Sequence, residues 1–261
     1  MLKTRLWAAH HLDRWESRVR RVAENWGWPQ AWLRELQAYL AQPRMTPEEF
    51  WVRYTLKRMA AEPLLDHLMT EREALDFYRT SDYPFWRNLV HRRHSAWRRV
   101  LVTMAQPDGL FVEYGCGTAP VTRFVAAHRP RWTYGLIDVE GPARAYGAWW
   151  IAVRHDGAPD EYHFRHAVES VEWLDDRMWA QVNVITALDV FEHLADPEPI
   201  ARMLVDRLAP AGYLHWNFVG NPRQYDLDLA TEAQRQATCA YLSGALDLVW
   251  EREGYRVSRR R

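Results

Sequence analysis

Three side chains that could transfer a proton or bind a cation lie within five residues of one another. Asp189, Glu192 and His193 are spaced i, i+3 and i+4, so a helical turn would present them on one face. The imidazole could act as a general base that removes a proton from a hydroxyl or amine nucleophile. All three groups could instead bind a divalent cation that lowers the pKa of the nucleophile. A third interpretation is that Glu192 and His193 only form local hydrogen bonds that hold their loop.

A glycine-rich bend lies earlier in the chain. Residues 111–120 read Phe-Val-Glu-Tyr-Gly-Cys-Gly-Thr-Ala-Pro, and a helical pattern follows directly. This order is typical of a buried strand that turns tightly into a helix and brings its backbone close to a ligand. A Cβ at Gly115 or Gly117 would obstruct both the turn and the ligand. A dinucleotide-binding fingerprint would place a third glycine where Pro120 stands, so a pyrophosphate at this helix N-terminus is disfavoured.

A carboxylate that could bind a ribose follows the bend. Asp138 comes directly after an apolar run over residues 132–137, which we interpret as the second buried strand. In a βαβ unit this strand lies beside the first one, so Asp138 should lie next to Gly115 and could accept hydrogen bonds from both ribose hydroxyls. The alternative is that Asp138 is a turn or helix-cap residue.

The elements that must position these residues alternate between strands and helices. Strands are expected at 110–114, 132–137, 161–165, 181–186 and 213–219, and helices at 120–128, 142–154 and 197–208. The alternation predicts an α/β fold, in which a Rossmann-like, doubly wound and mostly parallel sheet carries helices on both faces. Ligands bind at the carboxyl ends of the strands in such sheets, so the strand tips near 115, 138, 188 and 217 should converge.

The first part of the chain shows only helical patterns. An amphipathic stripe predicts a helix over 3–26, capping-box patterns at Thr46 and Thr70 precede helices, and a turn at 81–84 should lead into a helix over 85–104. We therefore expect two domains. Residues 1–104 would form an all-α domain that covers the substrate or binds a partner, and residues 105–261 would form the cofactor-binding domain.

Composition narrows the function classes. The chain has 261 residues and no net formal charge, and residues 1–104 hold 18 basic against 12 acidic side chains. This excess is smaller than the dense basic field of a dedicated nucleic-acid binder. Basic side chains between Arg87 and Arg99 could bind a phosphate or carboxylate, although such a run is more often a solvated helix face. Because two cysteines make no disulfide framework and no apolar run could cross a bilayer, we expect a cytoplasmic protein without membrane contact.

Five segments, taken in order, resemble the class I S-adenosylmethionine (SAM) methyltransferases. Glu113-x-Gly115-x-Gly117-x-Ala119 is similar to motif I of that family, and residues 134–139 are similar to its second-strand motif. Residues 183–197 resemble the fourth strand with its Glu-His loop. Residues 207–214 resemble the turn into the fifth strand, and residues 250–257 a segment near the end of the domain.

The resemblance implies a set of cofactor-binding residues. Glu113, Gly115 and Gly117 would surround the methionine part of SAM, Asp138 would bind its ribose, and Leu188 would flank it at the fourth strand. Tyr114 and Cys116 belong to the same bend and complete the set. The acidic residue that usually lies near the adenine has only Glu169 as a counterpart. The sequence ends at Arg261, soon after one terminal strand, so we expect the usual final hairpin partner to be missing from the sheet edge.

The Glu-His pair resembles that of ubiquinone-pathway O-methyltransferases and of small-RNA terminal 2′-O-methyltransferases, where such a cluster binds metal. The downstream histidine of the RNA family has only His215, inside the fifth strand, as a substitute. We predict an enzyme that transfers a methyl group from SAM to an oxygen or nitrogen atom of a small molecule. His193, Glu192 and Asp189 would be catalytic, with a divalent metal as the less favoured option. The alternatives are methylation of RNA or another phosphate-bearing polymer, and a non-catalytic partner protein of the same fold.

Overall fold

The computed structural model describes residues 30–65, 70–90, 94–154, 164–166, 181–218 and 229–261. The chain divides into two compact units, residues 1–56 and 57–261. The boundary between the two units follows residue 56, whereas we expected a domain boundary after residue 104. The whole sheet and every described helix after residue 70 therefore belong to the second unit. The predicted helix over 3–26 lies outside the described residues.

Two described helices begin in the first unit, and the second of them begins at the residue that the sequence predicts. After α2 (Gln30–Tyr39) comes α3 (Pro47–Leu65), which continues into the second unit. The Thr46 hydroxyl accepts a hydrogen bond from the Glu49 amide at 3.2 Å, and Glu49 Oε2 accepts one from the Thr46 amide at 2.9 Å. This reciprocal pair satisfies backbone donors that the first helical turn leaves free. Pro63 lies inside α3 near its end.

Three helices precede the sheet in the second unit: α4 (Glu71–Thr80), α5 (Tyr83–Val90) and α6 (His94–Thr103). The capping box at Thr70 and Glu73 is confirmed at the start of α4. The predicted turn at 81–84 is two residues too long, because α5 already begins at Tyr83 and includes Pro84 in its first turn. Proline is well tolerated in a first helical turn, where its missing amide leaves no hydrogen bond unmade.

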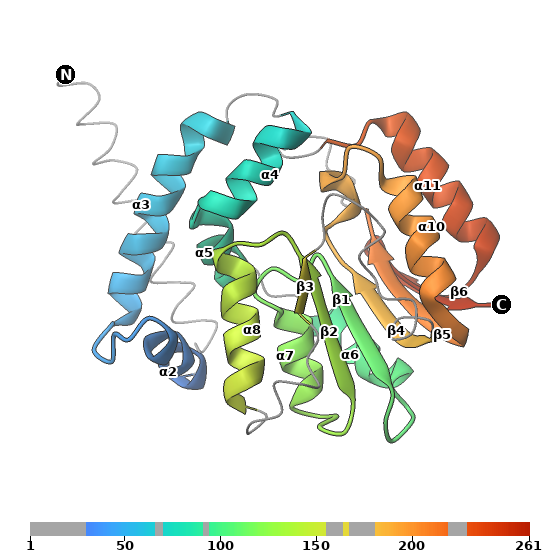
Figure 1. The fold of residues 1–261 in the computed structure, drawn as a ribbon, viewed down its shortest axis with the longest axis horizontal. Coiled ribbons are helices and arrows are strands. Elements are labelled where there is room, and N and C mark those ends of the chain that lie inside the picture. The colour runs from blue at the N-terminus through green and yellow to red at the C-terminus, as the bar shows by residue number, and fades with distance from the viewer. Residues whose placement is uncertain (1–29, 66–69, 91–93, 155–163, 167–180, 219–228) are drawn as a thin grey trace. The chain divides into compact units, whose positions relative to one another are not determined.

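The second unit is built on a seven-stranded sheet with the order β3-β2-β1-β4-β5-β7-β6 (Figure 1). Its strands are β1 (Leu110–Tyr114), β2 (Thr133–Asp138), β3 (Phe164–His166), β4 (Val182–Ala187), β5 (Leu208–Asn217), β6 (Leu246–Arg252) and β7 (Tyr255–Arg260). The first five are parallel, whereas β7 runs antiparallel to β5 and to β6. The strand order reverses between β1 and β4, which is the switch point where such sheets bind ligands. The predicted α/β doubly wound fold is thus confirmed.

Two differences from the expected strands have local causes. The sheet edge has both terminal strands, because the chain reverses at Glu253 and Gly254, which have φ values of 53° and 81°. Positive φ at two consecutive residues is typical of a tight hairpin turn. Strand β5 begins at Leu208 rather than after residue 212. The expected turn at Pro210-Ala211-Gly212 is an irregularity within the strand, where the pairing with β4 shifts register.

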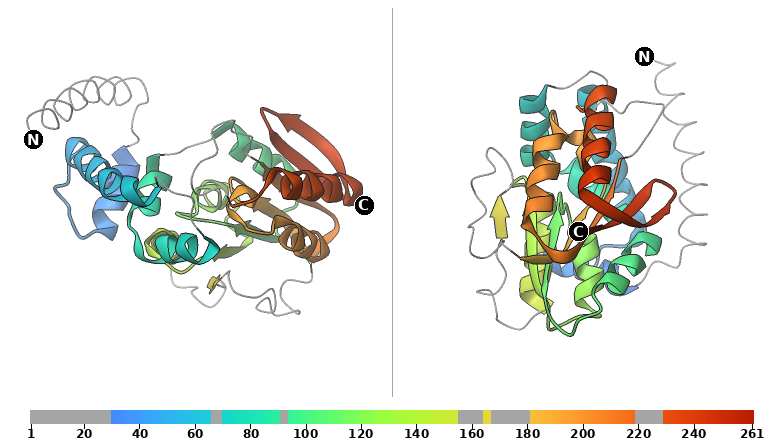
Figure 2. Two further views of the ribbon diagram at one scale, coloured as in Figure 1. Left: turned by 90° about the horizontal axis from the view of Figure 1, so that it is seen from above. Right: turned by 90° about the vertical axis from the view of Figure 1, so that its right-hand side faces the viewer.

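Helices cover both faces of the sheet (Figure 2). On one face, α6 and the helices α7 (Pro120–Ala126) and α8 (Pro142–Arg154) share a core that includes Phe111 and Val184. On the other face, α10 (Pro197–Arg207) and α11 (Glu232–Ala245) enclose a core that includes Val112 and Ile185. Neighbouring residues of one strand enter different cores because side chains alternate across a strand. Among the described residues, no helix combines the length and apolar character needed to cross a bilayer.

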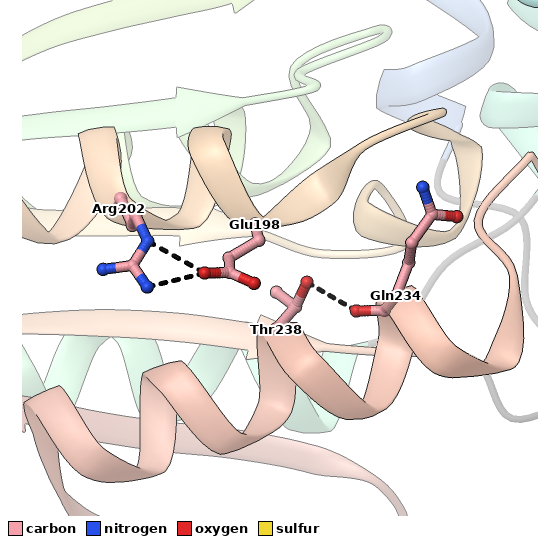
Figure 3. Close-up of polar contacts among 4 residues, drawn as sticks. All are labelled: Glu198, Arg202, Gln234 and Thr238. Carbon is pink, nitrogen blue, oxygen red and sulfur yellow. Dashed lines mark hydrogen bonds and ion pairs between the residues drawn. The ribbon is translucent and has the colours of Figure 1, made fainter.

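Helix α11 was not predicted, although its start carries a sequence signal. Thr231 and Gln234 form a capping box, the third in the described chain, and this spacing was readable in the sequence. Figure 3 shows polar contacts on the paired helices: Glu198 and Arg202 form an i,i+4 ion pair on α10, and the Thr238 hydroxyl donates to the Gln234 carbonyl at 2.8 Å. Gln234 Nε2 also donates to the Ala195 carbonyl at 2.6 Å, which ties α11 to the loop after β4.

Candidate functional site

One cavity of about 670 Å³ lies at the carboxyl ends of β1, β2 and β4. Its volume falls within the range of roughly 300–1,000 Å³ that is typical of small-molecule sites. The residues predicted to bind a cofactor or to be catalytic all line it: Glu113, Tyr114, Gly115, Cys116, Gly117, Asp138, Leu188, Asp189, Glu192 and His193. Three of the four predicted strand tips, near residues 115, 138 and 188, therefore converge on the cavity, whereas Asn217 at the fourth tip is not among its lining residues.

Glycine is required at two positions of the bend, both by the backbone conformation and by neighbouring side chains. Gly115 and Gly117 have φ values of 66° and 50°, in the left-handed region that side chains disfavour. A Cβ at Gly115 would overlap Val190 Cγ2, and a Cβ at Gly117 would overlap Asn88 Nδ2. The close approaches are thus to the loop after β4 and to α5. Burial raises the pKa of the Cys116 thiol well above its ordinary value, so this cysteine stays protonated.

Glu113 holds the bend against the start of α7. Helix α7 begins after Ala119, which has no side chain that could cap it. The Glu113 carboxylate accepts hydrogen bonds instead, from the Thr122 amide at 2.7 Å, the Thr122 hydroxyl at 2.5 Å and the Val121 amide at 3.3 Å. Burial raises the pKa of Glu113 to about 7, in opposition to these hydrogen bonds. Glu113 therefore fixes the position of the bend as well as lining the cavity.

Asp138 ties the tip of β2 to the same bend. Its Oδ2 accepts a hydrogen bond from the Gly117 amide at 2.5 Å, and its Oδ1 accepts one from the Val139 amide at 2.6 Å. Burial raises the pKa of Asp138 to about 6. Each carboxylate oxygen has a second acceptor position, so these contacts leave room for a ligand hydroxyl. The expected proximity of Asp138 to the glycine bend is confirmed.

The loop after β4 does not have the helical shape that the spacing predicted. Asp189 has a φ of 57° and precedes a single 3₁₀ turn over Phe191–His193. Asp, Glu and His therefore do not share one helical face. Among the residues that the structure describes, no three His, Cys, Asp or Glu side chains are grouped so that they could hold a metal ion. Asp189, Glu192 and His193 are therefore not grouped as three ligands of one ion in this structure.

Protein contacts hold two of these three residues. Asp189 is held by Asn217 at the tip of β5, which bonds both its amide and its carboxylate. Glu192 is 2% exposed, and its carbonyl accepts hydrogen bonds from the amides of Leu229 and Ala230. His193 is only partly buried, and its ring centroid lies 6.2 Å from that of Tyr78 on α4. All three residues line the cavity.

Helices α4 and α5 contribute lining residues, of which the sequence had indicated only Arg87, as a member of the basic run. Tyr78, Arg87 and Asn88 all face the cavity, and Arg87 is the only Lys or Arg among the described lining residues. The sequence showed only helical patterns in this region, so it predicted a helical cover but did not identify Tyr78 or Asn88 as residues of the site. Arg98 and Arg99 are exposed on α6 instead, so these members of the basic run do not share a site with Arg87.

Several other sequence-based candidates lie away from the cavity. His215 is buried, burial lowers its pKa to about 3, and its Nε2 lies 2.9 Å from the Thr103 hydroxyl. It is therefore a neutral core residue and not a substitute ligand. Among the aromatic residues, Tyr83 lines the cavity, whereas Trp149, Trp150 and Trp216 pack in the two cores. Glu169 lies outside the described residues.

Comparison with known proteins finds a family match within the second unit. Residues 112–214 match the family model described as a methyltransferase domain. No curated protein sequence matches the chain. An O-methyltransferase family protein from Burkholderia thailandensis has a similar structure, with a TM-score of 0.56 and 13% identity over 82% of this chain and 71% of that one.

Two further solved structures are similar over a smaller share of this chain. A 1,6-didemethyltoxoflavin-N1-methyltransferase from Burkholderia thailandensis, with its substrate and S-adenosylhomocysteine bound, has 13% identity and a TM-score of 0.47 over 64% of this chain and 76% of that one. The cyclase SpnF has 15% identity and a TM-score of 0.45 over 60% of this chain. The match spans 59% of SpnF, less than two thirds of its length. At these identities the likeness is one of fold.

Proposed function

We propose that this chain, in which residues 112–214 match a methyltransferase-domain family model, is a class I SAM-dependent methyltransferase that transfers a methyl group from SAM to an oxygen or nitrogen atom of a small molecule. One observation carries the proposal: a single cavity contains both the glycine bend with Asp138 and the loop that bears His193. An acceptor held near His193 would therefore lie close to a cofactor held at the bend. Methyl transfer requires this proximity, because the nucleophile must approach the carbon–sulfur bond in line.

The residues around the bend fit the cofactor. Asp138 offers a carboxylate to ribose hydroxyls, and the bend over 113–117 brings backbone to the cavity wall. Arg87 is the only guanidinium among the described lining residues and would pair with the carboxylate of the methionine part. When bound, SAM supplies an electrophilic methyl group on a sulfonium. Two free cysteines and the absence of a disulfide among the described residues support the proposed cytoplasmic location.

His193 would act as the general base for the acceptor. It is the only member of the Asp189–His193 cluster that carries a titratable nitrogen, it is partly buried, and it lines the cavity near Tyr78. A neutral imidazole can remove a proton from a hydroxyl or from an ammonium group, whereas Asp189 is engaged by Asn217. In this proposal Asp189 and Glu192 shape the loop and its charge rather than bind a metal.

Transfer of a labelled methyl group tests the function. The protein would be incubated with methyl-labelled SAM and, separately, with the small-molecule and RNA fractions of a cell extract. We expect label in the small-molecule fraction, and a loss of about a hundredfold or more in His193→Ala, the usual contribution of a general base. His128→Ala is the matched control, since His128 is exposed after the end of α7, is not among the residues that line the cavity, and has its Nδ1 within 2.8 Å of the Phe124 carbonyl. Label in RNA would favour the polymer alternative, and no label in either fraction would favour a non-catalytic partner.

A further inference from the structure

Thr186, on β4, has a buried hydroxyl at the cavity wall. Its side chain is fully buried, its Oγ1 has no hydrogen-bond partner among the described residues, and the residue lines the cavity. A buried hydroxyl without a partner loses its hydrogen bonds to water and gains none in return. Because native proteins pair nearly all buried polar groups, an exception beside a cavity suggests that a bound molecule completes the pairing.

The neighbours of Thr186 in the sheet are already satisfied. In the sheet register Thr186 lies between Glu113 on β1 and His215 on β5. Glu113 bonds the first turn of α7, and His215 bonds Thr103. The row therefore contains three polar side chains, of which the two outer ones have partners within the protein and the middle one belongs to a residue that lines the cavity.

The position of Thr186 indicates which end of the cofactor would lie near its hydroxyl. Asp138, proposed to bind the ribose, lies at the tip of β2, and β1 with its bend lies between β2 and β4. A nucleoside derivative whose ribose lies at β2 and which extends across β1 would reach β4 with its other end. In SAM and S-adenosylhomocysteine that end is an amino acid, whose ammonium and carboxylate groups can each pair with a hydroxyl.

We infer that the Thr186 hydroxyl binds the amino-acid end of the S-adenosyl cofactor and helps to distinguish it from shorter adenosine thioethers. The inference rests on the proposed function, because it assumes that this cofactor occupies the cavity. Valine has the shape of threonine without the hydroxyl, and the neighbouring cores are apolar. The Thr186→Val variant should therefore keep the fold, and its unliganded thermal stability should equal or exceed that of the wild type.

Calorimetry with two probes tests the inference. S-adenosylhomocysteine carries the amino-acid end, and 5′-methylthioadenosine has the same adenosine and thioether without it. We expect Thr186→Val to weaken S-adenosylhomocysteine about tenfold, the usual effect of one hydrogen bond to a charged group, and to leave 5′-methylthioadenosine unchanged. Thr186→Ser should bind both probes as the wild type does.

Other outcomes separate the two proposals. Wild-type affinity of Thr186→Val for S-adenosylhomocysteine would overturn the inference, as would an equal loss for both probes, which indicates a structural role. If Thr186→Val fails to fold, the Ser and Ala variants give the same comparison, since they differ by one hydroxyl. Absence of binding of either probe by the wild type would instead overturn the proposed function, and the inference with it.

Discussion

Asn217 and Asp189 are joined by two hydrogen bonds across the tips of β5 and β4. Asn217 Oδ1 accepts from the Asp189 amide at 2.7 Å, and Asn217 Nδ2 donates to Asp189 Oδ1 at 2.6 Å. Asn217 is 2% exposed, and Asp189 has a φ of 57°. The amide of Asn217 thus fixes a backbone conformation that few residues adopt without support. The loop that carries His193 depends on this pair for its direction.

Asn217→Ala should lower the free energy of unfolding by about 1–3 kcal/mol, since it leaves a buried amide and a carboxylate without their partner. It should also weaken binding of S-adenosylhomocysteine, because Asp189 and Leu188 line the cavity. Urea denaturation and calorimetry measure the two effects. Asn183→Ala is the matched control: Asn183 accepts from the Leu110 amide at the opposite end of the sheet, so it should lower stability without changing the affinity. Equal affinities in the two variants would contradict the proposed role of Asn217.

Gly115→Ala should destabilise the protein by about 2 kcal/mol or more, because φ is 66° and the new Cβ would overlap Val190. Adding Val190→Ala should recover only the part that comes from the overlap. Gly244→Ala provides a control of opposite sign, since it lies within α11 with nothing within 4 Å of the new Cβ. It should stabilise the protein by about 0.5–1 kcal/mol. Urea denaturation of the four proteins checks these signs, and a neutral Gly115→Ala would show that the bend is relaxed.

Glu113 should make stability depend on pH. Burial raises its pKa from 4.5 to about 7 in the folded state, so the unfolded chain releases this proton at a lower pH than the folded one. The stabilisation is present below pH 4.5 and is lost as pH rises towards 7, by about 3 kcal/mol in total from linkage. The difference in unfolding free energy between wild type and Glu113→Gln should therefore shrink between pH 4.5 and 7. Urea denaturation at several pH values checks this, and a constant difference would refute the shifted pKa.

The sequence predicted well those features that depend on residues close together in the chain. The apolar runs before Glu113, Asp138 and Leu188 predicted strands, and parallel strands must end at one edge of their sheet, so the strand tips were expected to converge. The resemblance to the SAM methyltransferases then named the individual cofactor residues at those tips. The capping pairs at Thr46 and Thr70 were equally local, because donor and acceptor lie three residues apart.

What could not be predicted depends on contacts between distant residues. Asn217 and Asp189 are 28 positions apart, and His215 and Thr103 are 112 apart, so no pattern in the chain links them. Glu113 was expected to face the cofactor, yet its hydrogen bonds cap α7 because Ala119 cannot. The helical face assumed for Asp189, Glu192 and His193 failed since the spacing carries no information about a positive φ at Asp189.

Calorimetric titration with S-adenosylhomocysteine tests the central proposal most directly. The wild-type protein should bind one molecule, and Asp138→Ala should weaken that binding about tenfold or more, because it removes the carboxylate proposed to accept the ribose hydroxyls. Asp108→Ala should bind as the wild type does, since Asp108 is exposed and pairs only loosely with Arg131 at 3.8 Å. No binding by the wild-type protein, or unchanged affinity in Asp138→Ala, would contradict the account of this cavity as a SAM site.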